Sequence, residues 1–272
     1  MNKRTAATVS KVPAVTLGFW IIKILATTLG ETGGDTVTMT WLGETTAHPN
    51  PNGYLIGTAV FLTALVVFVI LQIAAKKFHP FLYWATIIAS TTAGTTMADF
   101  ADRSLGIGYA GGSSVLFACV LASLAVWYFA EGTVSVQTVS RPRVEAFYWI
   151  TITFSQTLGT ALGDWVAAAP DEDPPGMGIG YEFGALIFVA ALAIVAALYF
   201  RSRVSHVLLF WTAFILTRPL GATVGDLLDK PVNHGGLSLS RPVASAVLAA
   251  LIILLIVVLP QRAAQHPSTK AA

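Results

Sequence analysis

The chain has 272 residues, of which 55% are hydrophobic and only 11% are charged. A soluble domain of this length could not bury so much apolar surface, so the composition predicts an integral membrane protein whose main partner is lipid. The formal net charge of +2 is too small to indicate a nucleic-acid partner. A lone cysteine, Cys119, excludes an intrachain disulfide and a cysteine metal cluster. We expect no cofactor and no removable signal peptide.

One stretch of sequence occurs four times and aligns without gaps: Phe19–Asp35, Tyr83–Asp99, Tyr148–Asp164 and Phe210–Asp226. Each copy opens with an aromatic residue and a tryptophan, and each carries a glycine five residues before its closing aspartate. Successive aspartates are separated by 64, 65 and 62 residues. Self-similarity at a nearly fixed period indicates internal repeats. We therefore predict one membrane domain, residues 1–272, built from four units at about residues 12–76, 80–140, 146–204 and 206–262.

Each unit supplies two apolar stretches, a first span that carries the repeated sequence and a second span. A helix of about 20 residues crosses a bilayer core about 30 Å thick, and stretches this long and apolar cross lipid as helices. We therefore predict an all-α membrane protein with eight transmembrane helices. The predicted spans are Val12–Thr38, Gly53–Ala75, Pro80–Asp99, Ser113–Ala130, Ala146–Val166, Tyr181–Phe200, His206–Leu228 and Pro242–Leu259.

The segments between the spans alternate in charge. Cytoplasmic loops of membrane proteins carry an excess of lysine and arginine, so this alternation predicts that both termini are cytoplasmic. The basic group comprises Lys3, Arg4, Lys11, Lys76, Lys77, Arg141, Arg143, Arg201, Arg203, Arg262 and Lys270. The opposite group comprises Arg103, Lys230 and Arg241 together with Glu44, Asp102, Asp171, Glu172, Asp173 and Asp229.

A unit of two spans returns the chain to its starting side, so all four first spans are expected to point outward from the cytoplasm. Parallel repeats of this kind imply a pseudo-fourfold axis along the membrane normal, or two pairs about a pseudo-twofold axis. The repeated glycines would let the first spans approach closely as an inner ring, with the second spans facing lipid. The aromatic–tryptophan pairs would then anchor the protein at the cytoplasmic boundary, where such rings prefer to lie.

The repeated aspartates are expected in the outer part of the membrane, because Trp20 and Asp35 are about 22 Å apart along a helix. An anion near the C-terminal end of a helix opposes the helix dipole. Four such anions would also repel one another, so a bound cation, protons or a basic side chain should compensate them. The alternative is that the aspartates are turn or cap residues exposed to water.

The first unit departs from the others, because Lys23, Thr27 and Glu31 lie at i, i+4 and i+8 on one helix face. Charged groups inside a membrane face the bundle interior and have a partner. A structural Glu31–Arg218 or Glu31–Lys23 pair is therefore one expectation. Pro219 is predicted to kink or break its helix. A polar layer is predicted at one level of the first spans, formed by Thr27, Thr91, Gln156 and Arg218.

The segments GETGGD, AGTTMADFADR, QTLGTALGDW and RPLGATVGDLLDKP resemble those of a bacterial family of uncharacterised polytopic membrane proteins. That family was once labelled membrane-anchored regulators of amylopullulanase. The resemblance covers nearly the whole chain, and it implies a bacterial membrane location but no reaction. A looser similarity is to cation exporters whose paired Glu-x-Gly-Asp motifs handle manganese or calcium. Here one additional residue separates Glu31 from Asp35, and the other three copies lack the glutamate.

These observations favour a transporter of a small cation in the bacterial inner membrane, with Mn²⁺ as the first divalent candidate. Divalent cations of this kind suit carboxylate oxygens, and the predicted metal ligands are Glu31, Asp35, Asp99, Asp164 and Asp226. Lys23 and Arg218 are predicted as counter-charges on the ion pathway, with Thr27 and Gln156 as polar neighbours. The alternative is a non-transporting scaffold, sensor or regulatory protein. We do not expect an enzyme, since no nucleophile–base pair or cofactor loop is recognisable.

Overall fold

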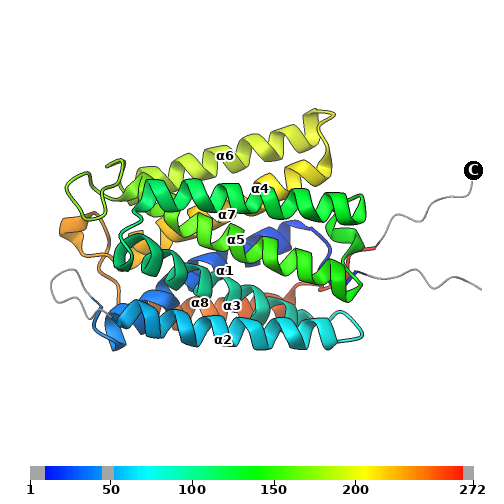
Figure 1. The fold of residues 1–272 in the computed structure, drawn as a ribbon, viewed down its shortest axis with the longest axis horizontal. Helices are drawn as coiled ribbons and strands as arrows, with labels where there is room; N and C mark the ends of the chain where they lie inside the picture. The colour runs from blue at the N-terminus through cyan, green and yellow to red at the C-terminus, as the bar shows by residue number, and fades with distance from the viewer. Residues whose placement is uncertain (1–9, 45–51, 266–272) are drawn as a thin grey trace, which may run out of the picture.

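The computed structural model describes residues 10–44 and 52–265, and over these residues the chain is helical (Figure 1). The described part contains eight α-helices and no β-strand, with a single isolated β-bridge between Pro13 and Ala263. The helices are α1 (Leu17–Asp35), α2 (Gly53–Ala74), α3 (Pro80–Asp99), α4 (Tyr109–Glu131), α5 (Pro142–Ala167), α6 (Tyr181–Arg201), α7 (His206–Asp229) and α8 (Arg241–Val258). The all-α prediction is therefore confirmed for these residues.

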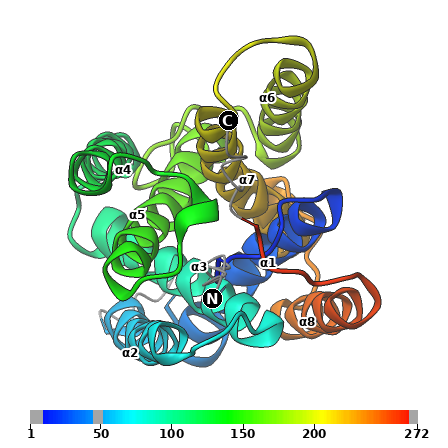
Figure 2. The same ribbon diagram turned by 90° about the vertical axis from the view of Figure 1, so that its right-hand side faces the viewer.

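The helices derived from the first spans form an inner ring. Helix α1 packs against α3 and α7, and α5 packs against the same two helices. Viewed along the helices, α1, α3, α5 and α7 lie inside and α2, α4, α6 and α8 lie outside (Figure 2). Each outer helix has its largest contact with the inner helix of the following unit: α2 with α3, α4 with α5, α6 with α7 and α8 with α1.

The outer helices present large apolar side chains on the surface of the molecule, including Phe129 and Phe200, which are 85% and 80% exposed. Among the described residues, five helices are long and apolar enough to cross a membrane, namely α2, α4, α6, α7 and α8. Helices α1, α3 and α5 are less apolar because they are rich in threonine and glycine. Since other helices surround them, they gain little from an apolar surface.

The repeated glycines are the points at which neighbouring inner helices touch. A Cβ atom added at Gly221 of α7 would lie 2.2 Å from Thr27 Oγ1 of α1, and one at Gly94 of α3 would lie 2.9 Å from the Gln156 carbonyl carbon of α5. Equivalent contacts join Gly30 to Thr91 and Gly159 to Arg218. At each glycine, the polar-layer residue of the next helix around the ring therefore occupies the space that a side chain would need. The predicted close approach of the first spans is confirmed.

The aromatic–tryptophan pairs also join neighbouring inner helices, which corrects the prediction that they anchor the protein in lipid. Tyr83, Trp84 and Tyr148 are fully buried. The first aromatic residue of each unit packs against the tryptophan of the next unit, and α7 closes the ring onto α1. The ring centroids are 5.4 Å apart for Phe19 and Trp84, 5.8 Å for Tyr83 and Trp149, 6.2 Å for Tyr148 and Trp211, and 5.8 Å for Phe210 and Trp20.

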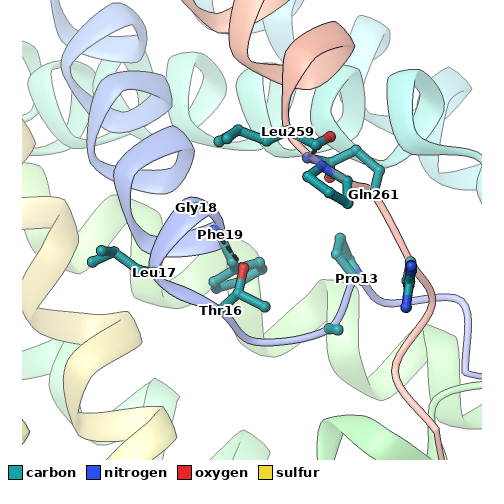
Figure 3. Close-up of a pocket in the computed structure, with 10 residues that line it drawn as sticks. Pro13, Thr16, Leu17, Gly18, Phe19, Leu259 and Gln261 are labelled. Carbon is teal, nitrogen blue, oxygen red and sulfur yellow. Dashed lines mark hydrogen bonds between the residues drawn. The ribbon is translucent and has the colours of Figure 1, made fainter.

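The first helix begins at Leu17, later than the predicted span that starts at Val12. Thr16 caps the helix, because its hydroxyl accepts a hydrogen bond from the Phe19 N–H at 3.2 Å (Figure 3). The residues before it form a strap that pairs with the C-terminal segment: Ala14 N–H donates to the Arg262 carbonyl at 2.7 Å, and Ala264 N–H donates to the Val12 carbonyl at 2.8 Å. Val12 is thereby buried instead of spanning lipid.

Other predicted boundaries shift by a few residues. Helix α4 begins at Tyr109 instead of Ser113, and α5 begins at Pro142 instead of Ala146. The first spans of units one and two continue as π-helical turns, Thr36–Trp41 and Phe100–Ser104. Helix α7 runs without a break through Pro219, so of the predicted kink or break the break is wrong and the kink stays a prediction. Membrane helices tolerate an internal proline when their neighbours pack around it.

Candidate cation site

Arg218 lies at the centre of the inner ring and connects all four inner helices. Its Nη2 atom on α7 lies 2.8 Å from Glu31 Oε2 of α1 and 2.6 Å from Thr95 Oγ1 of α3, and it also contacts Thr160 Oγ1 of α5. The arginine side chain is fully buried and that of Glu31 is 3% exposed. Thr95 and Thr160 occupy the position of Glu31 in units two and three, so the repeat itself supplies the partners of Arg218.

Lys23 is not the partner of Glu31. Its Nζ atom donates to Gln156 Oε1 at 3.4 Å and lies 4.2 Å from the centre of the Phe214 ring. Thr27 donates its hydroxyl proton to backbone carbonyls of Ile24 and Thr217. Of the two predicted charge pairs, the structure therefore forms Glu31–Arg218, and it leaves Lys23 buried with no carboxylate partner in the described part of the chain.

The four repeated aspartates are buried at the ends of the inner helices. Asp35, Asp99, Asp164 and Asp226 are 1%, 2%, 4% and 2% exposed. The alternative that they are water-exposed turn residues is therefore wrong. Basic side chains compensate them, which was one of the three expected solutions.

Two cations bridge the four aspartates in pairs. Arg103 lies 3.4 Å from Asp99 and 3.3 Å from Asp164, so it joins α3 to α5. Lys230 lies 3.2 Å from Asp226 and 3.5 Å from Asp35, so it joins α7 to α1.

Both bridging cations follow an aspartate by four residues, in the sequences DFADR (residues 99–103) and DLLDK (residues 226–230). This i, i+4 spacing is visible in the sequence, although the alternation of charge by itself predicts that both cations lie in outer loops. Burial by itself would lower the pKa of Lys230. The Asp226 and Asp35 carboxylates outweigh burial and raise that pKa well above its usual value.

A third cation reaches the same region from an outer helix. Arg241 begins α8 and lies 3.3 Å from Asp229 and 3.8 Å from Asp35. The corresponding aspartate of unit two, Asp102, has no hydrogen bond to either carboxylate oxygen. Burial raises the pKa of Asp102 to about 7, although the nearby Arg103 guanidinium opposes the shift.

Three of the five predicted metal ligands lie together. Glu31, Asp35 and Asp226 each offer one carboxylate oxygen, and within the described part of the chain these oxygens all lie within 4.8 Å of one another. The structure does not bring Asp99 and Asp164 into this group; both are instead paired with Arg103. Among the described residues, neither oxygen of Asp35 accepts a hydrogen bond, although Lys230 and Arg241 lie 3.5 Å and 3.8 Å from its Oδ2. The arrangement suits a small cation that takes oxygen ligands.

Four segments of the chain, residues 18–78, 82–133, 147–205 and 209–262, match the family described as Repeat of Unknown Function (DUF347). The chain belongs to this family. Its four repeats confirm the four units derived from the sequence. The chain matches no curated protein and no solved structure, so the label of amylopullulanase regulator stays a prediction.

The candidate site combines residues that recur in all four repeats of this chain with charged residues that do not. The glycine and the closing aspartate recur, so Asp35 and Asp226 belong to the repeated pattern. Glu31 is particular to repeat one, Arg218 to repeat four, and the bridging cations Arg103 and Lys230 to repeats two and four. Repetition therefore builds the scaffold, and single substitutions within it create the charge pattern.

A pocket of about 270 Å³ lies between the start of α1 and the residues that follow α8, at the opposite end of the inner helices from the aspartates (Figure 3). Its lining residues include Pro13, Leu17 and Leu259, and Arg262 is its one charged side chain. This lining has no carboxylate, so we assign the candidate cation site to Glu31, Asp35 and Asp226.

Proposed function

We propose that the protein transports a small cation across the bacterial inner membrane, with Mn²⁺ as the first ion to test. The observation that carries this proposal is the grouping of Glu31, Asp35 and Asp226, whose oxygens lie within 4.8 Å of one another inside the helix ring. Carboxylates this close repel one another, and Arg218 and Lys230 offset part of that repulsion. A divalent cation bound to the three oxygens would supply further positive charge.

The charge balance around the site supports a cation as well. The buried carboxyl groups at this end of the described helices are Glu31, Asp35, Glu44, Asp99, Asp102, Asp164, Asp226 and Asp229. The cations paired with members of this group are Arg103, Arg218, Lys230 and Arg241. Eight acidic groups against these four basic groups leave an excess of negative charge in a buried region, where uncompensated charge is costly. Bound cations or protons would remove the excess.

The proposed architecture has eight membrane spans with both termini in the cytoplasm. Its support is the parallel packing of the inner helices, whose first aromatic residues meet at one end and whose aspartates meet at the other, together with the exposed apolar surfaces of the outer helices. Six described basic residues lie in the last or first turn of a helix or within three residues of its end, at the ends of α2, α5 and α6: Lys76, Lys77, Arg141, Arg143, Arg201 and Arg203. Lys3, Arg4 and Lys270 lie outside the described residues.

We propose that the four repeats are related by a pseudo-fourfold axis. The bridging cations Arg103 and Lys230 follow only a pseudo-twofold axis, because they occur in alternate repeats. The glycine contacts and the aromatic contacts recur at all four inner-helix interfaces. The bridging cations occur at two of them, with Arg103 between α3 and α5 and Lys230 between α7 and α1.

A specific observation favours the second candidate function, a non-transporting scaffold or sensor. Arg218 Nη2 contacts side chains from α1, α3 and α5, and such a network could serve to hold the inner helices together. In that case the charges of the site would contribute stability without binding an ion.

The experiment that separates these functions is cation flux in proteoliposomes, measured for a panel that includes Mn²⁺ and Ca²⁺ alongside the thermal stability of the same proteins in detergent. Transport predicts that the Glu31→Gln protein remains folded and loses flux. The amide is nearly isosteric with the carboxylate but offers the cation no negatively charged oxygen. The matched control is Glu145→Gln. Glu145 is also fully buried and lies 2.7 Å from Lys11, but it lies in the first turn of α5, at the other end of the helix from Asp164.

Loss of flux in Glu31→Gln with retention in Glu145→Gln supports the proposed site. Unaltered flux in a stable Glu31→Gln protein would exclude that site. A stable wild-type protein that moves no ion in the panel would instead favour the scaffold or sensor function.

A further inference from the structure

The three nitrogens of the Arg218 guanidinium differ in the number of hydrogen-bond acceptors around them. Its Nη2 atom contacts three oxygen acceptors, on Glu31, Thr95 and Thr160, although an Nη2 group carries only two protons. Among the described residues, the Nε and Nη1 atoms, which carry the other three protons, have no hydrogen-bond partner. The side chain is fully buried, so bulk solvent does not reach them. Nη2 therefore faces more acceptors than it has protons, while the N–H groups of Nε and Nη1 have no acceptor among the described residues.

The path of the arginine side chain depends on Gly159 of α5. A Cβ atom at that position would lie 2.2 Å from Arg218 Cγ and 2.4 Å from Arg218 Cβ. The stem of the arginine therefore occupies the space that the missing side chain leaves free. From the polar layer it reaches the next level of the ring, where Glu31, Thr95 and Thr160 lie.

The carboxylate that Arg218 neutralises is also one of the three that form the candidate cation site. Glu31 Oε2 accepts the arginine hydrogen bond at 2.8 Å, and Glu31 belongs to the group with Asp35 and Asp226. A cation bound to Glu31 and the arginine bound to Glu31 would be two positive charges on one buried carboxylate. Their mutual repulsion in a medium of low dielectric constant makes the two occupants compete.

We propose that Arg218 is a tethered competitor for the cation site. When the site is empty, the guanidinium neutralises Glu31, and when a cation binds, the cation takes over that carboxylate from Arg218. The three N–H groups on Nε and Nη1 can form new hydrogen bonds, and the hydroxyls of Thr95 and Thr160 can keep accepting from Nη2. The arginine can therefore release Glu31 without leaving the ring. Competition of this kind weakens cation binding and favours release. This inference rests on the proposed function, because it assumes that a cation binds at Glu31.

Lys23 provides the charge control. It is fully buried on the same helix as Glu31, but its amino group is bound to Gln156 Oε1 and lies over the Phe214 ring. Removing its charge changes the electrostatic potential of the ring without removing a contact to Glu31. A general electrostatic effect would appear in both Lys23→Gln and Arg218→Gln, whereas competition for the carboxylate would appear mainly in Arg218→Gln.

The test is direct titration of the purified full-length protein in detergent with Mn²⁺ and with Ca²⁺, followed by calorimetry. We expect Arg218→Gln to bind the cation at least about tenfold more tightly than the wild-type protein. We expect Lys23→Gln to change the affinity by less than about threefold, and Glu31→Gln to abolish binding. Arg218→Lys keeps the charge but lacks the planar fork, so it should bind more tightly than wild type and serves if Arg218→Gln does not fold.

Wild-type binding combined with weaker or unchanged binding in the Arg218 variants would overturn the competition while leaving cation transport intact. An equal gain in Lys23→Gln and Arg218→Gln would also overturn it, since the effect would then be long-range. A wild-type protein that neither binds nor moves a cation would remove the proposed function itself, and the competition with it.

Discussion

At the scale of single residues, Arg103 and Lys230 account for how the inner helices can end in buried aspartates. Each cation lies one turn beyond an aspartate of its own helix and also reaches the aspartate of the neighbouring helix. A cation in this position is favourable for two reasons, because it complements the C-terminal end of the helix dipole and neutralises the carboxylates. Units one and three have no cation at this position; they carry Met39 and Ala168 there.

The Glu31–Arg218 pair gives the most direct test at this scale. Breaking a buried ion pair typically costs about 3–5 kcal/mol, because the remaining charge has no partner. If the pair is purely structural, Glu31→Gln and Arg218→Gln should each lower the free energy of unfolding in detergent by about that amount. The double variant should then recover much of the loss.

A transport role predicts a different pattern for the same variants. Glu31 would then belong to a group of carboxylates whose mutual repulsion opposes folding. We therefore expect the Glu31→Gln protein to keep its thermal stability in detergent and to lose cation flux. A large stability loss in Glu31→Gln that Arg218→Gln reverses, with no cation flux in the wild-type protein, would contradict the transporter.

At the scale of secondary-structure elements, the inner helices are held by contacts that need small side chains. Every repeated glycine lies where a side chain of the next inner helix passes, and contacts between small residues are the usual way in which membrane helices approach closely. The same residues lower the hydropathy of α1, α3 and α5, so these helices resemble the interior of the protein more than a lipid-facing span.

Substitution of Gly94 tests this packing. A Cβ atom there would lie 2.9 Å from the backbone carbon of Gln156 and from the backbone nitrogen of Thr157, and backbone atoms cannot move aside as a flexible side chain can. Overpacking typically costs about 1–3 kcal/mol, which exceeds the gain of about 1 kcal/mol in helix propensity. We therefore expect Gly94→Ala to lower the midpoint of thermal unfolding.

Gly33→Ala on α1 is the matched control, because the nearest side-chain atom to an added Cβ would be Leu29 Cδ1 at 3.9 Å. This variant should be neutral or slightly more stable than wild type. Equal stability changes in the two variants would mean that the helix contacts at Gly94 are looser than described.

At the scale of the whole molecule, three levels of symmetry are superimposed along the inner ring. The aromatic and glycine contacts follow all four units, the bridging cations follow alternate units, and the Glu31–Arg218 pair occurs at one interface. The candidate cation site lies at this last interface, between α1 and α7. A symmetric scaffold would not need this asymmetry, whereas a site for one ion can use it.

The proposed topology can be tested with reporter fusions along the chain. Fusions after Lys77, Arg143 and Arg203 should report the cytoplasm, and fusions at Gly111, Asp173 and His234 should report the outside, because these positions lie at opposite ends of the helices. The measurement is alkaline phosphatase activity against green fluorescence in cells. A single loop with the reverse signal would mean that α1, α3 and α5 do not all cross the membrane.

The sequence by itself determined the elements and their number. Ungapped repetition required four similar units, and long apolar stretches with glycine and threonine patterns indicated two helices in each. It also identified Glu31 and Arg218 as charges at neighbouring levels of the first spans. These properties depend on periodicity and composition, which are local and can be read along the chain.

Only the tertiary structure decided which groups meet. The choice of Arg218 over Lys23 as the partner of Glu31 depends on how α7 packs against α1, with the arginine stem passing Gly159 of α5. Six of the eight residues in the aromatic–tryptophan pairs are buried, and Trp20 and Phe210 are half-buried, because the inner helices turn the pairs toward one another. Sequence spacing does not specify this rotation. Likewise, Arg103 and Lys230 reach aspartates on neighbouring helices, and such contacts between distant units depend on the closure of the ring.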